Sequence, residues 1–263
     1  MELRPCIDIH NGKVKQIVGI TLSDEDEKAK ENFVSERDAD FFAKFYEERG
    51  ISGGHVIMLN KSGTENYEKT KAQALLALHA FPGGLQIGGG INADNAMDFI
   101  KEGASHVIVT SYVFSNGRIN YDNLDKLRVA VGKERVVLDI SCRRKNDNYY
   151  VVTDRWQTFT DEEVDLSLLE KLSDHCDEFL IHAVDAEGKS EGIDERLVKT
   201  LGKWKGCPVT YAGGIKDYDD IHRIKELSEG RLNITIGSAL DLFGGPLNFE
   251  TVLQLCVSGG RLL

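Results

Sequence analysis

Eight short apolar runs, each followed by a segment with helical periodicity, constrain the fold of this 263-residue chain more than any other feature. A short run rich in Val, Ile and Leu is typical of a strand that is covered on both faces, as in a parallel sheet. We expect these strands at Arg4–Ile9, His55–Leu59, Leu85–Ile87, His106–Thr110, Val136–Ile140, Phe179–His182, Val209–Tyr211 and Ile234–Ile236.

The segments between these runs place their apolar residues on one side of a helix. Gly50, Gly103 and Gly132 stand where three of these segments should stop, and glycine is common just after a helix C-terminus. We expect helices at Asp38–Arg49, Glu65–Ala80, Ala93–Glu102, Tyr121–Val131, Leu166–Cys176, Asp194–Trp204, Asp217–Leu227 and Asn248–Cys256.

Eight strand–helix units in about 250 residues are typical of a (β/α)₈ barrel, which we predict as a single domain over residues 1–263. An open, doubly wound sheet of six or seven strands is the alternative. Three short elements also occur once in each half of the chain and in the same order, which predicts two similar half-barrels. They are IDI and LDI at 7–9 and 138–140, GGI at 89–91 and 213–215, and the strand-end serines Ser111 and Ser238.

Composition and charge exclude several classes of partner and location. Lys and Arg total 32 against 43 Asp and Glu, a net charge of −11, so we expect neither a nucleic-acid nor a membrane partner. No signal peptide, transit peptide or membrane span is visible in the sequence. The cysteines are odd in number and form no CxxC pair, which favours free thiols in a reducing cytoplasm.

Asp8 and Asp139 are the candidate catalytic residues. Each lies near the end of an apolar strand, and the two strands are the first and fifth, which lie opposite each other in an eight-stranded barrel. A carboxylate in an apolar run is costly to bury without a partner or a function. One such Asp could be purely structural, but two at matching positions favour an acid/base pair.

Two glycine-rich turns are candidate phosphate sites. Glycine allows backbone N–H groups to surround a phosphate, and a following helix N-terminus adds partial positive charge. A single Gly-Gly could be only a tight turn, but each turn here has a strand-end Ser on the next strand. The predicted phosphate-binding residues are Gly89, Gly90 and Ser111 in one half, and Gly213, Gly214, Gly237 and Ser238 in the other. The SALDLF segment after Gly237 suits the short extra helix found at barrel phosphate sites.

The segment 141–160 is longer than a usual barrel connection. It contains a predicted hairpin at NDNYYVV, positive charge that includes Arg143 and Arg155, and Trp156 as a flat stacking surface. A solvated charge run is the alternative for the arginines. The acidic first loop, 21–35, is expected to act as a mobile lid.

Two further candidates, His182 and Cys142, are weaker. His182 should point toward the barrel mouth, although a structural role is equally consistent with its position. Cys142 has no visible base to make it a nucleophile. We expect no metal, because the sequence has neither HExxH nor a His/Cys cluster.

Together these motifs resemble a known family, the histidine-biosynthesis isomerases that act on phosphoribosylformimino-aminoimidazole carboxamide ribotide, in their eukaryotic-type form. The motifs are CIDIHNGKVKQIVG, LQIGGGIN, HVIVTS, LDISCRR, RWQTFTD, EFLIHAVDAEGKSEGID, YAGGI and IGSALDLFGG. The resemblance implies an Amadori rearrangement of an aminoaldose to an aminoketose, with no cofactor. The implied partner is a small substrate with a phosphate at each end, bound by a monomer.

The resemblance also implies roles for individual residues. Asp8 would be the general base that removes the proton from ribose C2′, and Asp139 the general acid that protonates the ring oxygen. Trp156 would pack on the ligand. Two positions depart from the family pattern. Ala183 replaces a common Thr, with Asp185, Glu187 or His182 as substitutes, and Asn92 replaces a common Arg, with Arg143, Arg144 or Arg155 as substitutes.

Three rival functions share some of these features. The cyclase subunit of imidazole glycerol phosphate synthase has the same two-Asp, two-phosphate plan, and phosphoribosylanthranilate isomerase is a more distant candidate. A phosphosugar-binding barrel without catalysis is the third, although the presence of both Asp8 and Asp139 argues against it.

Overall fold

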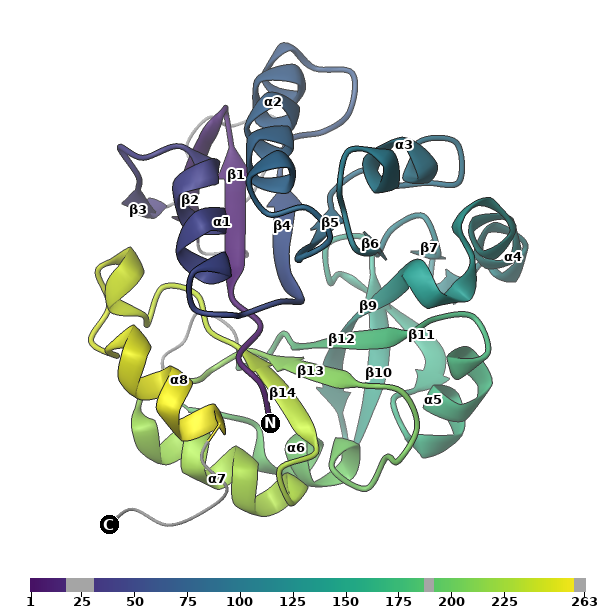
Figure 1. The fold of residues 1–263 in the computed structure, drawn as a ribbon. Coiled ribbons are helices and arrows are strands. Elements are labelled where there is room, and N and C mark those ends of the chain that lie inside the picture. The colour runs from purple at the N-terminus through teal and green to yellow at the C-terminus, as the bar shows by residue number, and fades with distance from the viewer. Residues whose placement is uncertain (18–30, 187–191, 258–263) are drawn as a thin grey trace.

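A computed structural model describes residues 1–17, 31–186 and 192–257. Its eight parallel strands form a curled sheet in the order β1, β4, β5, β6, β9, β12, β13 and β14 (Figure 1). The curl is closed by a parallel bridge between Leu3 and Ile234. Both predicted features, strands and closure, are therefore present, and the (β/α)₈ fold is confirmed. The bounds are β1 Cys6–His10, β4 Gly54–Met58, β5 Leu85–Gly88, β6 Val107–Val109, β9 Val136–Lys145, β12 Glu178–Ala183, β13 Val209–Ala212 and β14 Leu232–Thr235.

Eight α-helices of the described residues lie outside the curled sheet (Figure 1). They overlap all eight predicted helices, and Gly50, Gly103 and Gly132 have the positive φ values expected at helix ends. The bounds are α1 Ala39–Glu47, α2 Glu65–Ala80, α3 Ala96–Lys101, α4 Tyr121–Val131, α5 Leu166–Ser173, α6 Glu195–Leu201, α7 Tyr218–Ser228 and α8 Phe249–Val257.

Each half of the barrel begins with a strand that is extended by an antiparallel hairpin. β1 is followed by β2 (Lys13–Ile17) and β3 (Glu31–Val34), and β9 by β10 (Asn148–Thr153) and β11 (Thr158–Glu163). The second hairpin is the one predicted at NDNYYVV. Most of the predicted lid, 21–35, lies outside the described residues. The short elements β7 (Phe114–Ser115), β8 (Arg118–Ile119), η2 (Lys133–Arg135) and η3 (Asp241–Phe243) complete the chain.

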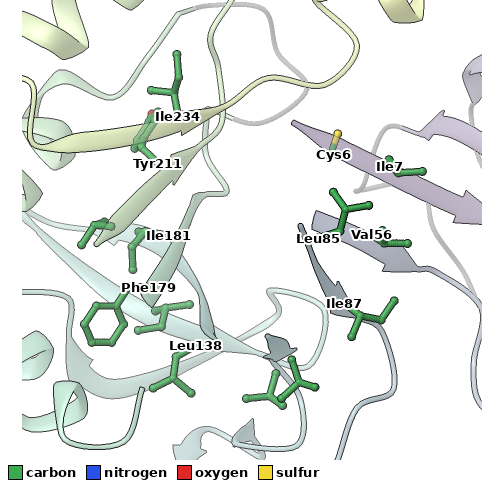
Figure 2. Close-up of a cluster of buried hydrophobic side chains, with 14 of the residues drawn as sticks. Cys6, Ile7, Val56, Leu85, Ile87, Leu138, Phe179, Ile181, Tyr211 and Ile234 are labelled. Carbon is green, nitrogen blue, oxygen red and sulfur yellow. The ribbon is translucent and has the colours of Figure 1, made fainter. Parts of the chain in front are cut away.

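The hydrophobic core has two layers because strand side chains alternate between faces. The larger layer contains buried side chains from nearly every strand together with the apolar faces of the helices, and Figure 2 shows part of it. The smaller layer comprises Ile108, Val137, Leu180 and Ala212, with Ile57 packed against them. Its members alternate along their strands with residues of the larger layer, so they fill the barrel interior. In the described residues, no helix is long and apolar enough to cross a membrane.

One group of buried polar side chains lies nearer the N-terminal ends of the strands. Glu178 accepts hydrogen bonds from the side chains of Gln86 and Thr210, and all three are at least 95% buried. His55 is also buried, and its burial, with lesser effects from His182 and Arg4, lowers its pKa to about 3. The folded protein therefore holds His55 neutral.

We predict that His55 makes folding weaken as the pH falls below 7. The unfolded imidazole takes up a proton near its ordinary pKa of 6.5, whereas the folded one does not until about pH 3, so acid favours the unfolded state. At pH 5 this difference costs about 2 kcal/mol of unfolding free energy. Urea unfolding at pH 7 and pH 5 measures it. His55→Gln should remove this component, and His222→Gln, at an exposed position, should retain it. An unchanged pH dependence in His55→Gln would contradict the prediction.

Candidate active site

The predicted site residues lie around the C-terminal ends of the barrel strands. β1, which carries Asp8, and β9, which carries Asp139, are separated by three strands and therefore lie on opposite walls. The glycine-rich turns follow β5 and β13, and the strand-end serines follow β6 and β14. Since β5 and β6 are neighbours, as are β13 and β14, each turn lies beside its serine. The mouth thus has two carboxylates facing each other and two candidate anion cradles facing each other.

Asp8 is held from a second strand. The side-chain amide of Gln16, on β2, donates a hydrogen bond to Oδ2 of Asp8 at 3.2 Å. Cys6, which points to the same face of β1, is buried beside it, and burial together with the Asp8 charge raises the pKa of the Cys6 thiol. The carboxyl group of Asp8 thus lies partly exposed at the mouth, and Gln16 holds one of its oxygens.

Asp139 is more deeply buried than Asp8, and its two carboxyl oxygens have different neighbours. The Thr110 hydroxyl, at the end of β6, donates to Oδ2 at 2.8 Å. Oδ1 is buried and has no hydrogen-bond donor within the described part of the chain, while Nδ1 of His182 lies 3.4 Å from it. His182 therefore belongs to the mouth, as predicted, beside Asp139. A protonated imidazole there would pair with the carboxylate.

The first cradle needs glycine for space as well as for conformation. Gly89 has φ +98°, and a Cβ on it would lie 2.0 Å from the Met58 carbonyl oxygen. Gly90 has φ +71° and is exposed, as is Ser111 on the neighbouring strand end. Backbone N–H groups and a hydroxyl therefore lie together at this turn, which is the arrangement an anion needs.

Asn92 has a different role from the one that the family pattern suggests. That pattern marks it as a missing arginine, but its Oδ1 accepts from the backbone N–H groups of Asp94 and Asn95. Asn95 in turn accepts from the Asn92 N–H and donates to the Gly90 carbonyl. This pair of asparagines braces the glycine turn. It also explains why α3 begins only at Ala96, later than the predicted Ala93.

The second cradle is built similarly. Gly213 has φ +126° and Gly214 has φ +78°, and a Cβ on Gly214 would lie 2.2 Å from the Gly192 carbonyl oxygen. Gly237 and the exposed Ser238 follow β14. The turn η3 begins three residues after Ser238, at Asp241, so the predicted extra helix is present as a single 3₁₀ turn.

Trp156 lies close to Asp139 through its hydrogen bond to β9. Its indole N–H donates to Oγ of Ser141 at 3.0 Å, and Ser141 points to the same face of β9 as Asp139. Asp154, Arg155 and Trp156 all have positive φ values, which form a left-handed turn between β10 and β11. Such backbone costs about 1–2 kcal/mol per residue, and strained residues gather at functional sites.

Arg143 and Asp185 join the β9 hairpin to the loop after β12. Nε of Arg143 donates to Oδ1 of Asp185 at 3.0 Å, and the backbone N–H of Arg144 donates to Oδ2 at 2.8 Å. Arg143 also donates to the Trp156 carbonyl at 3.4 Å. Asp185 is therefore occupied in fixing this hairpin, and Arg143 is paired with it. Arg155 lies exposed at the tip of the hairpin.

The structure describes one of the remaining candidates, Cys142, but not the other, Glu187. Cys142 is buried, its thiol donates to the His182 carbonyl, and burial raises its pKa far above the ordinary value, so it is not a reactive thiolate. All five cysteines are free thiols, as expected. Glu187 lies outside the described residues.

Four residues of the site were missed at the level of sequence. Gln16, Thr110 and Ser141 contact predicted site residues through side-chain hydrogen bonds, and Asn95 braces the first glycine turn. Thr110 and Ser141 each lie at a barrel strand end, which is a usable signal. Gln16 has no comparable signal, because KVKQI resembles an ordinary polar edge strand.

Comparison with known proteins identifies similar sequences over nearly the whole chain. Residues 2–245 match the family model described as "Histidine biosynthesis protein". A chloroplastic 1-(5-phosphoribosyl)-5-((5-phosphoribosylamino)methylideneamino)imidazole-4-carboxamide isomerase of Medicago truncatula is 53% identical, over 96% of this chain and 81% of the relative. Isomerases of the same name from Yarrowia lipolytica and Saccharomyces cerevisiae are 50% and 43% identical, over 93% and 92% of both chains.

Proposed function

The chain belongs to the histidine biosynthesis protein family, and from this we propose the reaction and the residues that perform it. It is an isomerase. It converts the phosphoribosylformimino aminoimidazole carboxamide ribotide aminoaldose to its phosphoribulosyl aminoketose. The observation that supports this most directly is the placement of Asp8 and Asp139 on opposite strands, between two opposed glycine–serine cradles.

Asp139 acts as the general acid in the first half of the reaction. It delivers a proton to the ribose ring oxygen, the C1′–O bond breaks, and the nitrogen lone pair forms a C1′=N Schiff base. The hydrogen bond from Thr110 to Oδ2 fixes the orientation of this carboxyl group. Burial within the barrel mouth keeps the carboxyl group away from bulk water.

Asp8 acts as the general base in the second half. It removes the proton from C2′, the electron pair moves to form the C1′=C2′ bond, and the nitrogen is neutralised as an enaminol. Ketonisation then places a proton on C1′ and a carbonyl at C2′. Positioned acid and base catalysis is typically worth about 10² to 10⁴ in rate for each group.

The two cradles hold the two phosphates and so orient the sugar between the carboxylates. Gly89, Gly90 and Ser111 bind one phosphate, and Gly213, Gly214, Gly237 and Ser238 bind the other. Trp156 packs on the ligand, with Arg143, Arg155 and His182 also in the binding site.

Since one chain supplies all these groups, we propose that the protein acts as a monomer. Its free thiols support a reducing, cytoplasmic location.

One assay tests this function against its rivals. The pure protein is incubated with the aminoaldose in the absence of ammonia and glutamine, and the product is followed by chromatography and NMR. Accumulation of the aminoketose supports the isomerase. Turnover only of the aminoketose, and only with added ammonia, would indicate the cyclase, whereas binding without turnover would indicate a non-catalytic barrel.

Removing the Asp185 charge should weaken substrate binding more than turnover. Asp185→Asn loosens the contact with Arg143, which lies partly exposed, and so frees the hairpin that carries Trp156. A partly exposed pair is worth at most about 1 kcal/mol, so KM should rise about three- to fivefold with little change in kcat. Steady-state kinetics measure both constants.

Two comparisons make that result specific. In a Trp204→Phe background Trp156 is the sole tryptophan, so its fluorescence should change in Asp185→Asn. Asp147→Asn is the matched control, because Asp147 lies on the same hairpin but pairs with Arg144 and with Arg196 of α6. Equal KM changes in both variants would argue against the role of Asp185.

A further inference from the structure

Gln16 is deeply buried for a glutamine, and its side-chain amide faces polar groups of β1. Its side chain lies on β2 but is 96% buried, as its exposed fraction is 4%. The amide nitrogen lies 3.2 Å from Oδ2 of Asp8 and 3.5 Å from Sγ of Cys6. Since an ionised carboxylate can only accept hydrogen bonds, the amide nitrogen must face Asp8 and the amide oxygen must point elsewhere.

The amide oxygen points toward the second anion cradle. A Cβ on Gly237 would lie 2.4 Å from Oε1 of Gln16, so glycine leaves the space that this oxygen occupies. An alanine there would have to displace a buried amide whose nitrogen is bonded to Asp8. The Gln16 side chain therefore lies between the carboxylate on β1 and the backbone of the loop that follows β14.

Two titratable groups beside Asp8 are uncharged at neutral pH. The Cys6 thiol lies on β1, and the Tyr46 hydroxyl comes from α1 and donates to the Cys6 carbonyl. Burial raises the pKa of both groups well above their ordinary values, and the Asp8 charge adds to the effect. A glutamine amide does not titrate, so its capacity to donate to Asp8 does not depend on pH.

We propose that Gln16 is the positioning residue of the general base: it fixes Oδ2 of Asp8, so that the other carboxylate oxygen faces the C2′ proton. This inference rests on the proposed function, in which Asp8 is that base. Gln16 also links the base to the second cradle, because its amide oxygen occupies the space that the missing side chain of Gly237 leaves. Displacing the amide should therefore change how tightly Asp8 holds its proton.

Two substitutions test the proposal by different physical routes. Gln16→Met keeps the length and the apolar packing of the side chain but removes the donor, and Gln16→Glu replaces the donor with a second carboxyl group. Loss of a hydrogen bond to the charged form favours the protonated form, and two adjacent carboxylates favour it more strongly. We expect the Asp8 titration midpoint to rise by about 0.5–1 pH unit in Gln16→Met and by more than about 1 unit in Gln16→Glu.

Carboxyl ¹³C NMR measures that midpoint directly, with the Asp8 signal assigned by its loss in Asp8→Asn. The acidic limb of the pH profile of kcat/KM should move in the same direction. At pH 7 we expect kcat to fall at least about tenfold in Gln16→Glu and KM to change less than about threefold. Gly237→Ala should raise the midpoint as Gln16→Met does.

Gln73→Met is the matched control. Gln73 also donates its amide to an aspartate, Asp38 at 2.9 Å, but at the start of α1 and away from the mouth. It should leave both the Asp8 midpoint and the acidic limb unchanged. An Asp8 midpoint that stays within about 0.2 pH unit in folded Gln16→Met and Gln16→Glu overturns the proposal. If the wild-type protein does not turn over the aminoaldose, the proposed function fails, while the NMR titration still decides the Gln16–Asp8 pairing.

Discussion

Asp8→Asn should lower kcat for the aminoaldose by at least about a thousandfold at pH 7 while leaving substrate affinity within about threefold. An amide is nearly the same size as a carboxyl group but cannot accept the C2′ proton, and a positioned base contributes up to about 10⁴ in rate. The new side-chain amide would still have an oxygen to face the Gln16 amide, so the packing around Cys6 should persist. Stopped-flow or chromatographic turnover, together with calorimetric binding of the substrate, separates the two quantities.

Asp38→Asn is the matched control for this substitution. Asp38 also accepts a hydrogen bond from a glutamine amide, but it lies beside α1 rather than at the barrel mouth. Its turnover should remain within about twofold of wild type. Comparable turnover in Asp8→Asn and the wild-type protein would remove Asp8 from the chemistry.

The barrel itself could be predicted because its determinants are local. Buried parallel strands require continuous apolar runs, and every helix that covers them requires a one-sided apolar stripe, so both patterns are visible in the sequence. The placement of Asp8 opposite Asp139 then follows from strand order alone. The glycine turns could also be predicted, because consecutive glycines directly after an apolar run are a local signal. The structure adds that a side chain at Gly89 or Gly214 would collide with the backbone of a neighbouring segment.

The contacts that tune the site were less predictable because they join residues far apart in the chain. Asp185 bonds Arg143 across 42 positions, and Thr110 reaches Asp139 across 29. From the sequence alone, Asn92 is interpreted as the loss of an arginine. The loop conformation that its side chain stabilises cannot be deduced from the neighbouring residues. Gln16 lies only eight residues from Asp8, but its inward orientation depends on how β2 leaves the wall of the barrel.

Asp139→Asn should also lower kcat at least about a thousandfold, but it should stop the reaction at an earlier step than Asp8→Asn does. Without a proton on the ring oxygen the C1′–O bond does not break, so no Schiff base forms. In Asp8→Asn the ring can still open and close, which interconverts the two anomers at C1′. NMR of the bound aminoaldose should therefore show enzyme-catalysed anomer exchange in Asp8→Asn and none in Asp139→Asn.

The control for this comparison is Asp177→Asn. Asp177 precedes β12 and pairs with His106 at the opposite end of the barrel, so both turnover and anomer exchange should match wild type. The reverse pattern, with exchange retained in Asp139→Asn and lost in Asp8→Asn, would exchange the acid and base roles. The two carboxyl groups have different neighbours, which gives a physical reason why their roles differ. Nδ1 of His182 lies beside Oδ1 of Asp139, whereas the Gln16 amide donates to Asp8. Anomer exchange therefore identifies the proton donor and the proton acceptor, because ring opening precedes product formation.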